Sequence, residues 1–538
     1  MKKIASYYKK YKYLLCVPFL FILLRAPTLG YDMFNTDVFK WKARIFDFGS
    51  GIFYLDFAKT IQKYHPGVSL MWPGALAVKF FNLKYDLFNG FPPPDNDINV
   101  VFELHAVQKF AVVFVIAVTL TFIFYALEKT IGRKYAILAT FLIAVEPFYV
   151  ALTRVIHLEG MMTTYMLASF SWYYYFLQDK TQRKRLLFSG VFGSLAVLTK
   201  TTALFMLPFV FLISFLSSYL KTHQSINSLK FSFKHGLLWL AIAFFGFVLL
   251  WPGVWVAPTE VFSALTRGVD TIGIEGGHGQ LFLGNWIESD PGVIFYPVVL
   301  WLRSSLYLLI GLVGFLFIAK NLNKKEKEFA LFVFLFAVFY TIELSIPSKK
   351  LDRYLLPSIV SLLLLSTFFY KYLWEKLKDA KNLRLLLFIP ALIHLVYLHP
   401  NYFAYYNPLA GGLSKGIFML EPKWTFGQQE LMQYLNELVV SENLELFSKG
   451  ESFHNSDSLD NKLTVAFPEK YYTQLEPFIK LIGGWAVIES LTAEAMETNF
   501  FIYPVWDDYS ANETRFDLEK IGTVKVHGVD IYNVYRRY

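Results

Sequence analysis

Long apolar runs dominate the first 400 residues of the chain. A bilayer core of about 30 Å requires roughly 20 apolar residues per helix, and about eleven segments fit this pattern. They are residues 13–30, 105–127, 136–152, 160–177, 186–199, 202–220, 236–252, 294–319, 329–346, 355–373 and 384–399. The run 186–220 is too long for one span, and we place its break at Lys200, because a lysine costs less at an interface than at mid-membrane. The pattern predicts an all-α polytopic membrane protein.

The pattern changes after Pro400, where no segment is long and apolar enough to span a bilayer. Residues 499–503 and 524–526 alternate as strands do, and residues 425–440 have the spacing of an amphipathic helix. We therefore predict two domains, a transmembrane domain over residues 1–399 and a small α/β domain over residues 400–538.

Basic residues orient this arrangement. They crowd six of the short connections, 2–12, 129–134, 180–185, 221–234, 320–327 and 371–384, and all six fall on one side of the predicted spans. The positive-inside rule makes that side cytoplasmic. We expect a multi-pass protein of the cell membrane with a cytoplasmic N-terminus. Two large loops, 31–104 and 253–293, and the domain after residue 400 are then extracytoplasmic.

Composition agrees with a membrane protein. Apolar residues make up 55% of the 538 residues and aromatic residues 19%, more than a soluble chain of this length needs for its core. The net charge of +9 resides in loops beside the spans, where it meets lipid headgroups, so we set nucleic-acid binding aside. Cys16 is the only cysteine, which excludes an intrachain disulfide and a cysteine-based zinc site. The basic, apolar N-terminus lacks a small-residue cleavage site, so we expect an uncleaved first helix.

The first outer loop contains two candidates for chemistry. Asp37 follows the first helix, where a carboxylate whose pKa is raised by an apolar wall can take a proton from an acceptor hydroxyl. The competing interpretation is that Asp37 caps a short helix. His65 begins a His-Pro-Gly sequence, which is also typical of a turn with a solvent-facing imidazole.

A second group of candidates lies where two spans meet. Arg154, His157 and Glu159 fall within six residues, close to Glu146. One ionisable residue there often anchors a helix end, but three together favour a polar site.

Three further candidates bear on anion binding. His278 lies in a glycine-rich stretch, where close backbone approach could hold a phosphate, although such loops are also simply flexible. Lys349 and Arg353 are cations on the outer side, against the positive-inside trend. Arg353 could pair with Asp352, but anion binding explains the arrangement more economically.

Five stretches together resemble a known family. They are the acid after the first helix followed by YHPGVSLMW, then RVIHLEG, LAVLTKTTAL, KKLDRYLLP, and HPNYFAYYNPLAGG leading into WTFGQQELMQYLNEL. This ordered set resembles the GT-C glycosyltransferases, in the branch of the dolichyl-phosphate-mannose protein mannosyltransferases and the lipid-A aminoarabinose transferases. Two positions depart from the family pattern: Val38 follows Asp37 where a Glu is frequent, and Glu159 stands where Asp is common.

The resemblance implies a GT-C fold, a polyprenyl-phosphate-linked sugar as donor, and inverting transfer to an acceptor hydroxyl of a protein, lipid or glycan. It makes Asp37 and Glu159 the candidate catalytic residues, with Asp37 as base. The substrate-binding candidates fall into three groups. Lys200, Lys349, Arg353 and His278 would stabilise the leaving phosphate, Arg154 and His157 would orient the acceptor or line the sugar pocket, and His65 would belong to the same outer site. Apolar grooves between helices would hold the prenyl chain. No metal ligand or cofactor is firmly implied, although Asp37 and Glu159 could share a divalent cation.

Two other classes share some of these features. A lipid or polysaccharide transporter or flippase also carries charges within many spans, but the sequence has no inverted repeat. A non-catalytic subunit of an envelope assembly would use the tail for binding and the charges for structure.

Overall fold

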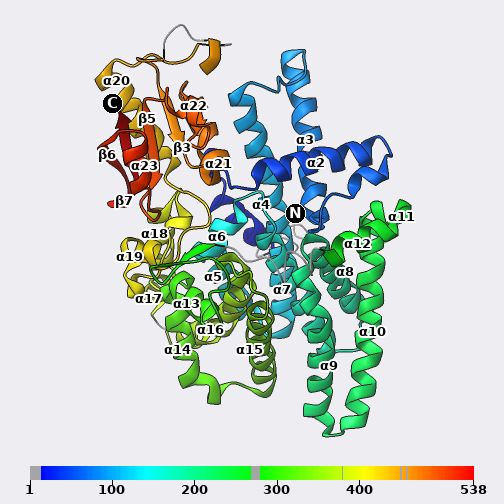
Figure 1. Ribbon diagram of the computed structural model, residues 1–538. Coiled ribbons are helices and arrows are strands. Elements are labelled where there is room, and N and C mark those ends of the chain that lie inside the picture. Colours follow the sequence, from blue (N-terminus) through cyan, green and yellow to red (C-terminus); the bar gives the residue numbers. More distant parts are fainter. Residues whose placement is uncertain (1–13, 268–278, 378–379, 449–450, 456–458) are drawn as a thin grey trace, which may run out of the picture.

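The computed structural model describes residues 14–267, 279–377, 380–448, 451–455 and 459–538. Figure 1 shows a bundle of helices below a smaller domain that contains a sheet and the C-terminus. The helices of the first 400 residues, after a short one at Leu14–Leu23, are α2 (Val38–Phe53), α3 (Val68–Asn89), α4 (Ile98–Thr130), α5 (Arg133–Val145), α6 (Pro147–Thr153), α7 (Glu159–Gln178), α8 (Arg183–Thr199), α9 (Met206–Thr222), α10 (Ser225–Leu250), α11 (Gly253–Val256), α12 (Pro258–Arg267), α13 (Phe295–Arg303), α14 (Leu306–Ile318), α15 (Lys324–Ser345), α16 (Leu356–Lys376), α17 (Lys381–Leu385) and α18 (Ile389–Leu398).

The number of spans is lower than the sequence pattern predicts. Within the described residues, five helices are long and apolar enough to cross a membrane, namely α4, α9 with the 3₁₀ turn before it, α10, α15 and α16 with the 3₁₀ turn before it. The pairs α5–α6 and α13–α14 bend by 68° and 107°, and counting each as one span gives seven. The predicted eleven segments are helical, but several of these helices are short or polar. The fold is a mostly helical, multi-span membrane protein.

The break predicted at Lys200 is confirmed. Helix α8 ends at Thr199, and a 3₁₀ turn (Thr201–Phe205) leads into α9. Gly67, which precedes α3, lies beside this break and donates its N–H to the Thr199 carbonyl at 3.2 Å. Its φ of +61° and the crowding of Trp41 against any Cβ require glycine there. The first outer loop is therefore fastened to the end of α8.

This first loop is more ordered than the sequence analysis expects. Most of residues 31–104 form the amphipathic helix α2, the helix α3 and the start of α4. α2 buries Val38, Trp41, Ile45 and Phe48 on one face. Asp37 is thus placed at the beginning of a packed helix rather than in a free loop.

The tail forms a mixed α/β domain, as predicted. Its elements are α19 (Gly412–Met419), α20 (Gln428–Glu442), β3 (Thr464–Phe467), α21 (Glu469–Leu481), β4 (Trp485–Ile488), α22 (Thr492–Ala495), β5 (Phe500–Pro504), α23 (Ser510–Arg515), β6 (Leu518–Val526) and β7 (Val529–Arg537). The sheet order is β4-β3-β5-β7-β6, and β3 is parallel to β4 and β5, whereas β7 is antiparallel to β5 and β6. A hairpin of β1 (Gln280–Phe282) and β2 (Asn285–Ile287) lies in the second of the loops predicted to be extracytoplasmic.

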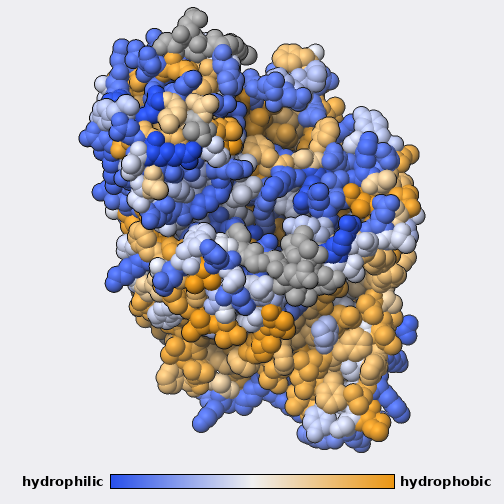
Figure 2. Space-filling model, in the orientation of Figure 1, coloured by the Kyte–Doolittle hydropathy of each residue, from blue (hydrophilic) through white to orange (hydrophobic). Residues whose placement is uncertain are grey.

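The surface reflects this division. Figure 2 shows hydrophobic residues over the helices of the lower half and hydrophilic residues over the tail domain and around the upper ends of the helices. An apolar belt of this kind is what a lipid bilayer requires.

Candidate active site

Five of the predicted site residues converge at one end of the bundle, although they come from distant parts of the sequence. Each lies where a helix begins or ends. They are Asp37 before α2, His157 and Glu159 at the start of α7, Lys200 after α8, and Arg353 in the 3₁₀ turn (Asp352–Leu355) before α16. We call this set the Glu159 network.

Glu159 is the centre of that network. Its side chain is 1% exposed, and Lys200 Nζ donates to its Oε1 at 3.0 Å. Arg353 Nε lies 3.4 Å from the same oxygen, and His157 Nδ1 contacts Oε2. A buried carboxylate is costly unless it is paired, and Glu159 has three partners of potential positive charge.

His157 links this buried carboxylate to Asp37. Its Nε2 lies 3.6 Å from Asp37 Oδ2, so the imidazole stands between two carboxylates. Burial opposes protonation of His157, but the charge of Glu159 and the hydrogen bonds to both carboxylates outweigh it and raise its pKa. The two carboxylates thus favour the protonated imidazole.

Asp37 is the accessible member, with a side chain 34% exposed. It occupies the cap position of α2, but its side chain makes no capping hydrogen bond, so the helix-cap interpretation is wrong. Burial raises its pKa, but the hydrogen bond to His157 and the charges of His157 and Arg353 outweigh burial and lower it. The raised pKa expected from the sequence is therefore also wrong: Asp37 stays ionised.

Arg353 does not form the ion pair with Asp352 that was the alternative to anion binding. Asp352 instead accepts from the buried Arg303, at 2.9 and 3.1 Å. Among the described residues, Arg353 Nε and Nη1 are buried without a hydrogen-bond partner, although Nε lies within ion-pair distance of Glu159. Buried donors are almost always satisfied. An arginine with idle donors beside an ionised, accessible carboxylate is suited to receive an anionic ligand.

His65 lies close to these charges but carries none itself. Burial and the nearby Lys200 lower its pKa well below the usual value. Its Nδ1 is buried without a hydrogen-bond partner among the described residues. His65 is thus a neutral group with one unused nitrogen.

The structure adds three residues that sequence reasoning did not select. Trp424 is fully buried, and Arg353 and His157 both lie against its ring. Lys200 Nζ lies 3.5 Å from the centre of the Tyr354 ring. Burial and the charges of Arg353 and Lys349 lower the pKa of Lys423 to about 8. A sequence signal was present for two of them, because Trp424 opens the last of the motifs that carried the family resemblance and Tyr354 lies in KKLDRYLLP, but nothing in these motifs indicated a distance to Arg353.

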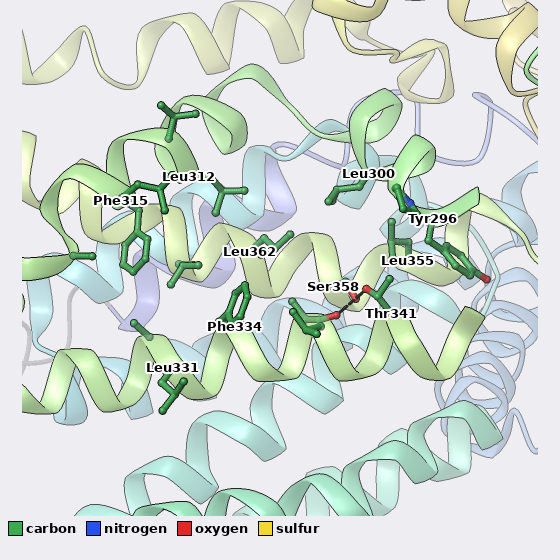
Figure 3. Close-up of a pocket in the computed structure, with 18 of the residues that line it drawn as sticks. Tyr296, Leu300, Leu312, Phe315, Leu331, Phe334, Thr341, Leu355, Ser358 and Leu362 are labelled. Atoms are coloured by element: carbon green, nitrogen blue, oxygen red, sulfur yellow. Dashed lines mark hydrogen bonds between the residues drawn. The ribbon is translucent and has the colours of Figure 1, made fainter. Parts of the chain in front are cut away.

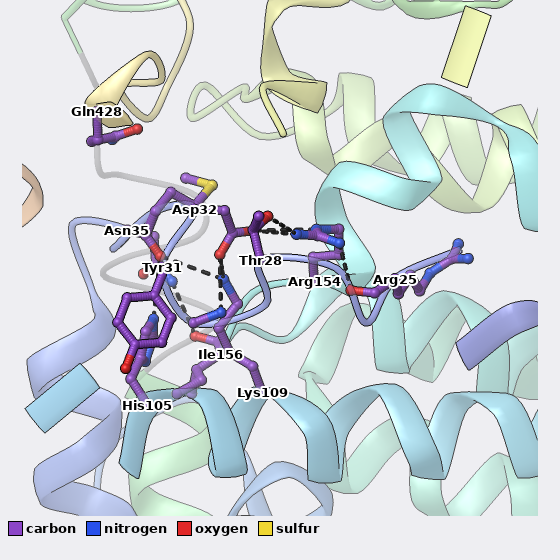
Figure 4. Close-up of polar contacts among 12 residues, drawn as sticks. Arg25, Thr28, Tyr31, Asp32, Asn35, His105, Lys109, Arg154, Ile156 and Gln428 are labelled. Carbon is purple, nitrogen blue, oxygen red and sulfur yellow. Dashed lines mark hydrogen bonds and ion pairs between the residues drawn. The ribbon is translucent and has the colours of Figure 1, made fainter. Parts of the chain in front are cut away.

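Arg154 is directed to a different network. Figure 4 shows it bonded to Asp32, which also pairs with Lys109. Arg154 Nη2 and Nε donate to Asp32 Oδ2 at 2.9 and 3.2 Å, and its remaining donor bonds go to the carbonyls of Arg25 and Pro27. We call Asp32, Lys109 and Arg154 the Asp32 network. Asp32 and the two backbone carbonyls thus use four of the five guanidinium N–H donors of Arg154. Its role in orienting the acceptor or lining the sugar pocket stays a prediction.

Two remaining candidates have other outcomes. His278 lies outside the described residues. Lys349 is half-buried near Lys423, while its neighbour Lys350 pairs with Asp290 at 2.7 Å. Glu146, close to the second group in sequence, accepts from the Ser305 hydroxyl at 2.6 Å and not from the Glu159 network.

The residues give no obvious metal site. No group of three or more His, Cys, Asp or Glu side chains in the described part of the chain is arranged to hold a metal ion. The His157 imidazole lies between Asp37 and Glu159, the two carboxylates that could share a divalent cation.

Part of the sequence that contains some of these residues matches a known protein family. Residues 84–261, which include His157, Glu159 and Lys200, match the family model of the dolichyl-phosphate-mannose-protein mannosyltransferases. The resemblance drawn from the motifs is thereby confirmed, and with it the class of enzyme, a glycosyltransferase that uses a lipid-phosphate-linked sugar. A search of curated protein sequences found no match.

Solved structures give more distant similarities. ArnT from Cupriavidus metallidurans bound to undecaprenyl phosphate is 11% identical, with a TM-score of 0.47 over 97% of this chain and 98% of ArnT. The oligosaccharyltransferase of Archaeoglobus fulgidus tethered to an acceptor peptide is 12% identical, with a TM-score of 0.44 over 93% of this chain and 70% of that one. The Pmt1–Pmt2 protein O-mannosyltransferase of S. cerevisiae is 18% identical, with a TM-score of 0.34 over 47% of this chain and 34% of that one.

Proposed function

We propose that the protein transfers a sugar from a polyprenyl-phosphate donor to an acceptor hydroxyl on the extracytoplasmic side, with inversion at the anomeric carbon. The observation that carries this proposal is Arg353, whose buried Nε and Nη1 have no hydrogen-bond partner among the described residues and which lies within the network that ends at Asp37. The site thus has a cation for a phosphate and a carboxylate for a hydroxyl.

The leaving group sets the role of the cations. When the bond between the anomeric carbon and the phosphate oxygen breaks, its electron pair stays on the polyprenyl phosphate. Arg353 stabilises that charge directly, and Lys200 and Lys423 add to the positive potential around it. No proton donor is needed, because phosphate is a stable anion at neutral pH.

Asp37 acts on the acceptor. Its carboxylate takes the hydroxyl proton as the acceptor oxygen attacks the anomeric carbon from the face opposite the phosphate. The lowered pKa keeps Asp37 ionised and makes it a weak base, which suits a reaction in which departure of the phosphate leads. Glu159 is too buried to reach the acceptor, and it holds His157 and Lys200 instead.

An apolar groove accounts for the lipid part of the donor. A cavity of about 830 Å³ lies between α14, α15 and α16, with a lining that is almost entirely hydrophobic. Figure 3 shows Leu331, Phe334 and Leu362 along it and Tyr296 and Leu355 at one end. Leu355 is two residues from Arg353 in the same turn. A prenyl chain in this groove would place its phosphate close to the guanidinium.

The test is a transfer and hydrolysis assay with purified protein and a labelled polyprenyl-phosphate sugar. Wild type should release polyprenyl phosphate, and Asp37→Asn should bind the donor normally while turnover falls by about 10²–10⁴-fold, the range for a lost general base. Movement of intact donor between leaflets without cleavage would instead identify a transporter. If the protein neither cleaves the donor nor moves it between leaflets, whether or not it binds the donor, the result would support the non-catalytic assembly subunit.

A further inference from the structure

Trp424 belongs to the tail, yet its side chain lies inside the Glu159 network. Its ring centre is 4.9 Å from that of His157 in an edge-on arrangement, and the Arg353 guanidinium lies 5.2 Å from it. Phe403 packs against the indole at 5.2 Å. The side chain is fully buried, and its indole N–H has no hydrogen-bond partner among the described residues. Trp424 therefore contacts both the cation assigned to the phosphate and the imidazole that contacts Asp37.

The backbone that follows Trp424 is held by three hydrogen bonds to other parts of the tail. Thr425 N donates to Gln474 Oε1 of α21 at 2.7 Å. The Tyr532 hydroxyl of β7 donates to the Phe426 carbonyl at 2.7 Å. Gly427 donates its N–H to Asn401 Oδ1 at 2.9 Å, with a φ of +83° that other residues rarely adopt. Three separate elements of the tail thus determine where the indole lies.

The same domain also contacts the chain beside Asp37. Thr473 of α21 donates its hydroxyl to the Thr36 carbonyl at 3.3 Å. Phe478, one turn further along α21, packs edge-on against Phe34 at 5.7 Å and against Phe102 at 5.3 Å. The tail therefore contacts the proposed site at two places, beside Asp37, the proposed base, and beside Arg353, the proposed phosphate ligand.

We propose that Trp424 is a positioning residue for sugar transfer, placed by the tail domain against both Arg353 and His157 so that both keep the orientation that donor phosphate and Asp37 require. This inference rests on the proposed function. A guanidinium on an aromatic face keeps its plane fixed, and small displacements of catalytic groups reduce rates strongly. The tail is then part of the active site rather than an appended domain.

The experiment compares Trp424→Leu and Trp424→Phe with Trp485→Leu in the full-length protein. Trp485 is the matched control, because it lies on β4 of the same domain and packs against Phe447. We expect Trp424→Leu to lower kcat per folded molecule by about 10–10²-fold, with a smaller change in donor binding. Trp424→Phe, which keeps an aromatic face and edge, should recover most of the rate, and Trp485→Leu should retain wild-type kcat.

Two further readouts separate positioning from simple packing. The alkaline limb of the pH profile, which we assign to His157, should move in Trp424→Leu but not in Trp485→Leu. A double-mutant cycle of Trp424→Leu with Arg353→Met should be non-additive in melting temperature, which needs no activity. Unchanged kcat and an unchanged pH profile in a folded Trp424→Leu protein, or strict additivity in the cycle, would overturn the proposal. If wild type itself fails to cleave the donor, the proposed function fails, while the cycle still decides whether Trp424 and Arg353 are coupled.

Discussion

Arg154 and Arg353 are both buried at the same end of the bundle, but they have opposite hydrogen-bond environments. Every guanidinium nitrogen of Arg154 donates to Asp32 or to a backbone carbonyl. Arg353 has Nε and Nη1 without hydrogen-bond partners among the described residues. The Asp32 network is therefore closed, and the Glu159 network is open to a ligand. Burial of a charge therefore does not by itself indicate function, and the unused donors are the observation on which the proposed phosphate site rests.

The positions of the closed network explain what it does. Asp32 lies in the loop before Asp37, Arg154 lies between α6 and α7 just before His157, and Lys109 lies on α4. Asn35 adds a bond from its side chain to the Ile156 carbonyl at 3.3 Å. The Asp32 network thus holds together the two segments that carry Asp37 and His157.

Arg353→Met, a variant of the Glu159 network, should lower activity more than any other substitution that compares the two networks. Removing a preorganised cation from the leaving phosphate should lower kcat by about 10²–10³-fold, with little loss of stability because few donor bonds disappear. Arg353→Lys should restore only part of the rate, since lysine lacks the planar fork. Turnover of labelled donor and thermal melting measure the two properties. Wild-type turnover by Arg353→Met would show that its unused donors do not serve the leaving phosphate, and the functional difference between the two arginines would be contradicted.

Asp32→Asn should have the largest effect on stability. It leaves Lys109 and Arg154 buried without their carboxylate, and breaking such a pair costs about 3–5 kcal/mol. We expect a clear drop in melting temperature and in yield of folded protein, whereas the protein that remains folded should still bind donor. If Asp32→Asn has normal stability but does not bind donor, the donor site lies at the Asp32 network and not at the Glu159 network.

The pH profile should sharpen the assignment of His157. Because its pKa is raised above 6.5, the imidazolium and the stability it contributes are fully present below that pH and are lost as pH rises through the folded pKa. Activity should therefore fall on the alkaline side by about tenfold per pH unit. Asp37, whose pKa is lowered, should add no acidic limb until well below pH 4. Measurement of kcat from pH 5 to 9.5 tests both, and His157→Gln should abolish the alkaline limb. A limb that persists in that variant belongs to another group.

His65→Asn should have the smallest effect. His65 is neutral, so replacing it with a neutral hydrogen-bonding side chain changes no charge. We expect a change of about threefold or less in donor KM, in line with one neutral hydrogen bond. A loss as large as that of Arg353→Met would show that His65 belongs with the cations and carries charge in the complex.

The sequence predicted the class of fold and much of the site, for identifiable reasons. Apolar runs, basic loops and the interfacial Lys200 report directly on a bilayer, and the alternation at 499–503 marks β5. Which arginine is open could not be predicted, because Arg154 and Arg353 have equal chemistry and differ only in long-range partners, Asp32 and Glu159. The count of spans was too high chiefly because several of the apolar segments form helices that are too short or too polar to cross a membrane, and because apolar composition does not reveal the bends within α5–α6 and α13–α14. Trp424 was missed because its two partners in the Glu159 network, Arg353 and His157, lie more than seventy residues away in sequence.

Equilibrium binding of polyprenyl phosphate tests the central claim, that the Glu159 network is the site for the donor phosphate. The measurement compares purified wild type with Arg353→Met and with Arg384→Met, which removes the same charge from α17 as a control. The account predicts that Arg353→Met weakens binding by at least about tenfold, the value of one charge-assisted hydrogen bond, while Arg384→Met binds as wild type does. Equal binding by wild type and a folded Arg353→Met protein would contradict it.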